Sequence, residues 1–129
     1  MSTQSIKKSQ KESLLFRAIA KLFAETAQDD QRLLGVAVSR VKLSDDKGVA
    51  VVYFYLPGGL EEFKDKLKTI LLYKSSLRRA LARTIDSRYT PELVFKYDDQ
   101  FEKTQRLEGI LEQIKEDVSS SEGDDSSSD

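Results

Sequence analysis

The chain has 129 residues, 39% of them hydrophobic, which suits one domain with a modest core. It has no cysteine and no histidine, which excludes disulfides, thiolate metal sites and imidazole-based catalysis. Of its 22 acidic residues, five lie in residues 117–129, which hold no base, so residues 1–116 carry 21 bases against 17 acids, a formal charge of +4.

No apolar run is long enough to span a membrane, and the start does not resemble a signal peptide, so a cytoplasmic protein is expected. Nothing in the sequence predicts a metal site, a cofactor or a small-molecule substrate. Residues 1–9 are polar and are expected to be flexible. Residues 10–28 carry apolar side chains at helical spacing, which predicts a first amphipathic helix.

A β-hairpin is predicted next, because residues 34–43 and 49–56 are rich in β-branched and aromatic side chains. Asp45 and Asp46 lie between the two strands. Their carboxylates could bind a metal, but Asp and Gly in this loop are more typical of a turn.

Two helices and a third strand follow. Residues 57–59, Pro-Gly-Gly, end the hairpin without the pattern of a phosphate loop, and a helix begins near Leu60. The helical pattern is interrupted at residues 73–76, where Ser75 and Ser76 are good N-caps for a second helix after a kink. That helix has an apolar face, which includes Leu77 and Leu81, and an arginine-rich outer face, which includes Arg79 and Arg83. From Leu93 the apolar period becomes two, which predicts a strand.

The C-terminal part divides into a helix over residues 100–116 and a tail over residues 117–129. The tail is acidic and lacks the apolar surface needed to fold, so it is expected to be disordered. The order α-β-β-α-α-β plus a C-terminal helix predicts a two-layer α+β domain with a three-stranded sheet over residues 10–99. The C-terminal helix is expected to pack on or beside that domain.

Residues 88–98, RYTPELVFKYD, resemble the R-x-x-P-E-L-x-F-x-Y-D signature of the ribosome-binding factor A family. Supporting similarities are Val41–Asp45 and Leu77–Arg79, and the match covers roughly residues 7–116. The resemblance implies a type II KH fold and a non-enzymatic factor. It also implies binding to 16S rRNA and the free 30S subunit in late assembly, 5′-end processing of precursor 16S rRNA, and a role in cold adaptation. A monomer is expected.

The sequence departs from this family where Ala-x-Gly is usual, because Tyr73-Lys74-Ser75 occupies the kink. Bulkier side chains there weaken the case for close RNA approach to the backbone. The basic helix beside the kink remains. Phosphates are predicted to lie near the kink and along the second central helix. The predicted RNA-binding residues are Lys64, Lys68, Lys74, Ser75, Ser76, Arg78, Arg79, Arg83 and Arg88.

Other readings of these residues stay open. The basic face could be a solvated helix surface, with Arg83 paired to Asp86 or Arg79 bonded to Ser75. Arg88 could belong to the basic surface, or it could bond Asp98 or a turn carbonyl. Four tyrosines could stack on bases, namely Tyr53, Tyr55, Tyr89 and Tyr97. Tyrosines on half-buried strands are more often packing residues, which is what we expect of Tyr53 and Tyr97.

The alternative function is a protein–protein adaptor whose basic face docks an acidic partner, with the acidic tail competing for that face. A nuclease is a third reading, weakened by the missing histidines and carboxylate clusters. Salt-sensitive binding to small-subunit rRNA would favour RNA over the adaptor.

Overall fold

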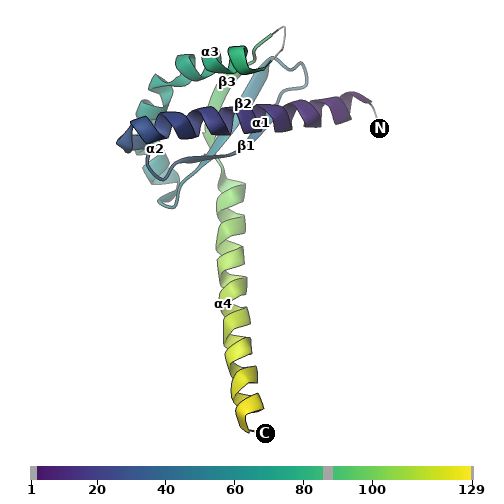
Figure 1. Ribbon diagram of the computed structural model, residues 1–129, viewed down its shortest axis with the longest axis vertical. Coiled ribbons are helices and arrows are strands. Elements are labelled where there is room, and N and C mark those ends of the chain that lie inside the picture. The colour runs from purple at the N-terminus through teal and green to yellow at the C-terminus, as the bar shows by residue number, and fades with distance from the viewer. Residues whose placement is uncertain (1–2, 86–88, 129) are drawn as a thin grey trace. The chain divides into compact units, whose positions relative to one another are not determined.

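The chain forms its helices and strands in the order predicted for a type II KH fold (Figure 1). The computed structural model describes residues 3–85 and 89–128. A short 3-10 helix, η1, follows the first helix. The elements are α1 (Thr3–Asp29), η1 (Gln31–Leu33), β1 (Ala37–Leu43), β2 (Val49–Tyr55), α2 (Gly59–Leu72), α3 (Lys74–Thr84), β3 (Glu92–Tyr97) and α4 (Asp99–Ser128).

Two boundaries differ from the prediction. The first helix begins at Thr3 instead of residue 10, and the last helix continues to Ser128 instead of ending near residue 116. Each added residue of an existing helix gains a backbone hydrogen bond, so a helix can extend past its apolar face. The chain divides into two compact units, Met1–Asp98 and Asp99–Asp129. The packing of the C-terminal helix on the domain stays a prediction.

The sheet has the order β1-β2-β3, with β1 antiparallel and β3 parallel to β2. Alternate residues of the central strand β2 are buried, namely Ala50, Val52 and Phe54, while the residues between them are half-buried. This period of two shows that the helices cover one face of the sheet. The resulting arrangement is the predicted two-layer α+β domain.

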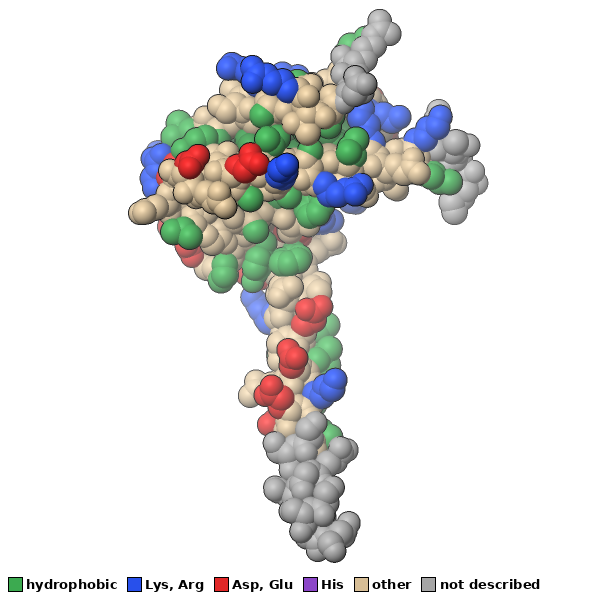
Figure 2. All heavy atoms as spheres, in the orientation of Figure 1, with side chains coloured by type: hydrophobic (Ala, Val, Ile, Leu, Met, Phe, Trp, Pro, Cys, Tyr) green, Lys and Arg blue, Asp and Glu red, His purple; other side chains and the backbone are tan. Residues whose placement is uncertain are grey.

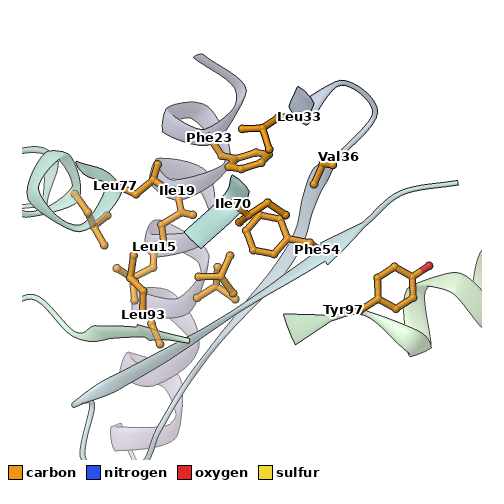
Figure 3. Packing of buried hydrophobic residues seen from close by; sticks show 14 of the residues in the cluster. Leu15, Ile19, Phe23, Leu33, Val36, Phe54, Ile70, Leu77, Leu93 and Tyr97 are labelled. Carbon is orange, nitrogen blue, oxygen red and sulfur yellow. The ribbon is translucent and has the colours of Figure 1, made fainter. Parts of the chain in front are cut away.

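The core lies between the sheet and helices α1, α2 and α3. Ile19 and Phe23 of α1 point toward Phe54 of β2 (Figure 3), and the Phe23 and Phe54 ring centroids are 5.0 Å apart. Leu77 and Leu81, one helical turn apart on α3, are both buried. The apolar face predicted for the second central helix therefore holds α3 against the sheet and leaves its other face to solvent.

The N-terminal half of α1 is fixed to β1 and to the hairpin loop. A Glu12 carboxylate oxygen accepts a hydrogen bond from the Leu43 backbone N–H at 2.7 Å, and Lys8 Nζ lies 2.9 Å from an Asp45 carboxylate oxygen. These partners are more than 30 positions away in the sequence. They give a physical reason for helical structure in a segment whose composition alone predicts flexibility.

Asp46 shapes the hairpin turn, as predicted. One of its carboxylate oxygens accepts hydrogen bonds from the Ser44 hydroxyl at 2.7 Å and the Gly48 N–H at 2.9 Å. These bonds to the charged form hold the pKa of the Asp46 carboxyl below its usual range.

Asp98, the last residue of the signature segment, is a buried link between β3 and β1. Its side chain is 1% exposed, and its Oδ2 accepts hydrogen bonds from Ser39 Oγ at 2.6 Å and Arg40 Nε at 2.9 Å. The register of β1 shifts between Val38 and Arg40, so these bonds lie at an irregularity of the edge strand. Asp98 therefore acts in the architecture of the sheet.

Candidate nucleic-acid interface

The outer face of α3 carries an exposed row of arginines. Because Leu77 and Leu81 face the core, Arg79 and Arg83, also four residues apart, face solvent. Figure 2 shows basic side chains along α3 at the top of the view. We call Arg79 and Arg83 the cationic ridge.

Within the described part of the chain, neither arginine of the ridge has an ion pair or a side-chain hydrogen bond. The alternative bond from Arg79 to Ser75 is thus not formed. Asp86, the other alternative partner, and Arg88, a predicted RNA-binding residue, lie outside the described residues. The ridge therefore presents two guanidinium groups to solvent.

The α2–α3 kink is formed by Tyr73 alone. Tyr73 lies between the two helices with φ −95° and ψ 0°, and its carbonyl accepts the Leu77 N–H at 2.8 Å. The prediction that serines cap α3 is wrong: Tyr73 occupies the N-cap position without a side-chain cap bond. Ser75 and Ser76 lie in the first turn instead, where backbone N–H groups have no partner within the helix.

The side chain of Tyr73 is turned away from the start of α3. Its ring packs against the core, and its hydroxyl donates a hydrogen bond to Asp30, which directly follows α1. Asp30 is also bound by Arg32, with Nη2 to Oδ2 at 2.7 Å and Nε to Oδ1 at 3.0 Å. The kink is thereby tied to the corner between α1 and η1. The bulky side chain that departs from the family pattern does not cover the α3 N-terminus.

The hydrogen bonds of this cluster shift the pKa values of Asp30 and Tyr73. The bonds from Arg32, and then from Tyr73, hold the pKa of the Asp30 carboxyl well below its usual range. The bond to Asp30, and then burial, raise the pKa of the Tyr73 phenol. The Asp30 contribution to stability is therefore present above pH about 4 and is lost as pH falls through its folded pKa. The Tyr73 contribution is present below pH about 10 and is lost as pH rises through its folded pKa.

We expect an ultraviolet titration to show a phenol whose pKa lies above the usual value of about 10, because the Tyr73 pKa is raised. Replacing Asp30 with asparagine should move that phenol back toward a pKa of about 10, because the anionic acceptor is lost. Asp29→Asn, an exposed neighbour, serves as the control and should leave the curve unchanged. Identical titration curves for the wild type and Asp30→Asn would contradict the hydrogen bond between Tyr73 and Asp30.

An open hollow of about 540 Å³ lies between α3 and the segment that leads into β3. Arg78 closes one side of it, because its Nε and Nη2 donate hydrogen bonds to the carbonyls of Pro91 at 3.1 Å and Thr90 at 3.0 Å. The residues that line the hollow are Ser75, Arg78, Arg79, Ala82, Tyr89 and Thr90.

The fold gathers some of the predicted RNA-binding residues and separates others. Lys74 is turned toward β3, with Nζ 4.0 Å from a Glu92 carboxylate oxygen. Ser76 lines a different groove, between α3 and α1. Lys64 and Lys68 are exposed on α2 and do not line the hollow, and Lys64 Nζ lies 3.6 Å from Glu61. Ser75, Arg78 and Arg79 are the predicted residues that meet in one place.

Thr90 is not among the residues predicted for the site, and Tyr89 is one of the four tyrosines that could stack on bases. Tyr89 is 72% exposed, whereas Tyr97 is buried and Tyr53 lies under the Arg40 guanidinium at 4.1 Å. The sequence does indicate where Tyr89 lies. Pro91 restricts the preceding residue, Thr90, to extended conformations, so Tyr89 belongs to a non-helical segment after α3.

Two kinds of feature are absent from the described residues. No group of three or more Asp or Glu side chains there is arranged to hold a metal ion. No helix in that part of the chain is long and apolar enough to cross a membrane.

Comparison with known proteins gives a consistent result. The family model described as ribosome-binding factor A matches residues 7–111. A ribosome-binding factor A from Legionella pneumophila is 41% identical over 95 residues, which cover 72% of this chain and 75% of the relative. One from Nitrosococcus oceani is 31% identical over 113 residues, which cover 88% of each chain.

Solved structures agree with the sequence matches. The crystal structure of ribosome-binding factor A from Thermus thermophilus is 32% identical with a TM-score of 0.60, and the match covers 70% of this chain and 94% of that one. A homology model of the Thermus thermophilus protein, as fitted into a cryo-EM map of its complex with the 30S, is also 32% identical. Its TM-score is 0.53, and the match covers 66% of this chain and 88% of that one.

Proposed function

Because the chain belongs to the ribosome-binding factor A family, we propose that it binds the 30S ribosomal subunit through 16S rRNA and assists late small-subunit assembly. In this proposal it acts in the cytoplasm as a monomer and on free subunits, without catalysing a reaction. It assists 5′-end processing of precursor 16S rRNA and is needed most in the cold.

The observation that carries the proposal is the cationic ridge, two exposed guanidinium groups one helical turn apart with no partner among the described residues. Charge supports it, because residues 1–98 hold 18 of the 21 bases and 12 of the 22 acids, a formal charge of +6. Planar guanidinium groups grip phosphate oxygens with two hydrogen bonds each. A surface of this kind favours the sugar–phosphate chain over a neutral partner.

The start of α3 adds donors of a second kind. Backbone N–H groups in the first turn, with the positive end of the helix dipole, favour an anion, and the exposed hydroxyl of Ser75 lies beside them. Because these groups would contact phosphates, they would not distinguish one base from another directly. Selectivity for the particle then comes mainly from the shape of the folded rRNA.

Co-sedimentation tests this function. The protein should pellet with mature 30S particles and with particles that contain precursor 16S rRNA, and release should rise steeply between low and high salt. The 50S subunit is the control for nonspecific binding to rRNA. Failure to pellet with either small-subunit particle at low salt would refute the proposal and favour the adaptor, which needs an acidic protein partner instead.

The finer part of the proposal needs a cellular test. A strain that lacks the protein should accumulate precursor 16S rRNA and grow poorly in the cold, and the intact gene should restore both. Normal 5′-end maturation in the cold without the protein would contradict that part while leaving 30S binding in place.

A further inference from the structure

Tyr89 is a large aromatic residue on the surface of the domain. Its side chain is 72% exposed, and it lines the hollow beside α3 together with a serine, two arginines, an alanine and a threonine. The volume, about 540 Å³, is within the range of roughly 300–1,000 Å³ that is usual for ligand pockets. Ala82 is the smallest side chain in its wall, which leaves room on the α3 side of the hollow.

The backbone that carries Tyr89 is held in place. Thr90 and Pro91 directly follow Tyr89. Arg78 donates hydrogen bonds to the backbone carbonyls of both, from Nη2 to Thr90 and from Nε to Pro91. Pro91 is buried and fixes its own φ, and the residue before a proline is restricted to extended conformations. A ring on such a segment loses little conformational entropy when it contacts a ligand.

The hollow combines three kinds of group. An exposed phenol ring offers a flat π face, on which a nucleic acid base of any identity can stack. Arg79 and the Ser75 hydroxyl offer donors to a phosphate on the α3 side. A duplex keeps its bases stacked inside the helix, so only an unpaired nucleotide can present a base face to Tyr89.

We propose that this hollow binds one unpaired nucleotide of single-stranded RNA, with its base stacked on Tyr89 and its phosphate at Ser75 and Arg79. Arg78 is a positioning residue, which holds the Tyr89 segment through its carbonyls. This inference rests on the proposed rRNA binding and adds a preference for an unpaired segment at the hollow beside the cationic ridge.

The test measures binding of the full-length protein to a short oligouridylate and to a short RNA duplex, at several salt concentrations. Tyr89→Ala should weaken binding of the single strand about 5- to 100-fold, the usual effect of losing one stacked base. The salt dependence should not change, because no charge is removed. Tyr89→Phe should bind almost as wild type, and duplex binding should be the same for all three proteins.

Three further variants separate the roles. Arg79→Gln should weaken both RNAs and reduce the single-strand salt slope by about 0.7. Arg78→Lys keeps the charge but loses the guanidinium fork, so it should resemble Tyr89→Ala with an unchanged slope. Leu72→Ala, which removes a 68% exposed side chain from α2 outside the hollow, is the matched control and should have no effect.

Equal affinity of wild type and Tyr89→Ala for oligouridylate would overturn the stacking site. An equal loss in Tyr89→Phe and Tyr89→Ala would also overturn it, since the ring is retained in the first. Wild-type affinity in Arg78→Lys would overturn the positioning role. In each case 30S binding by the wild type would still support the proposed function, whereas absence of 30S binding would refute both.

Discussion

The double substitution Arg79→Glu with Arg83→Glu is expected to weaken binding to the 30S subunit by about 100-fold or more. Each arginine that contacts a phosphate is worth roughly 1.5–3 kcal/mol, and the glutamates add repulsion. The salt slope should also fall, because fewer phosphates are neutralised. Both side chains are exposed on α3, so the free energy of unfolding should change by only about 0.5 kcal/mol per site.

The chain offers a matched control for this variant. Arg17 and Lys21 are also exposed and four residues apart, on α1 instead of α3. Arg17→Glu with Lys21→Glu changes the net charge by the same amount. It should weaken 30S binding only through the long-range electrostatic effect of the changed net charge. Affinities come from sedimentation at several salt concentrations, and urea unfolding verifies that both variants are folded.

If the folded α3 variant binds as wild type, the ridge is not the RNA-binding surface. If both variants lose equal affinity, the interaction depends on net charge and the assignment to α3 is wrong.

The largest effect on stability is expected from Asp98→Ala, a loss of about 3–5 kcal/mol in the free energy of unfolding. The carboxylate is 1% exposed and accepts hydrogen bonds from Ser39 and Arg40. Its removal leaves the Ser39 hydroxyl without this acceptor and the Arg40 guanidinium, 34% exposed, without its counter-ion. Urea unfolding followed by circular dichroism gives the difference.

Asp99→Ala is the natural comparison, because the neighbouring carboxylate is exposed. It should cost at most about 1 kcal/mol, the usual effect of an acidic residue in the first turn of a helix. Similar losses in the two variants would show that the buried bonds of Asp98 are not what stabilises the sheet.

The local geometry of this protein was readable from the sequence. Apolar residues four apart predicted that Leu77 and Leu81 would be buried, and they are. The same spacing predicted that Arg79 and Arg83 would face outward, and they do. Such predictions succeed because helical and strand periods decide which side chains share a face, whatever the rest of the chain does.

The signature segment also carried information, but of a different kind. It indicated the family, which the comparisons confirm, and not the role of each residue. Asp98 is a buried acceptor for Arg40 of β1, which lies 58 residues earlier in the sequence. Arg88, in the same segment, lies outside the described residues, and its RNA-binding role stays a prediction.

The sequence by itself determined the order of elements, the fold class and the basic outer face of α3. Only the tertiary structure decided that Tyr73 bonds Asp30, 43 residues away, and that Arg78 holds the backbone of Thr90 and Pro91. Hydrogen bonds of this kind join residues that come together only after the helices pack on the sheet. Because periodicity records neighbours on one element, it cannot distinguish an arginine that faces solvent from one that reaches the next strand.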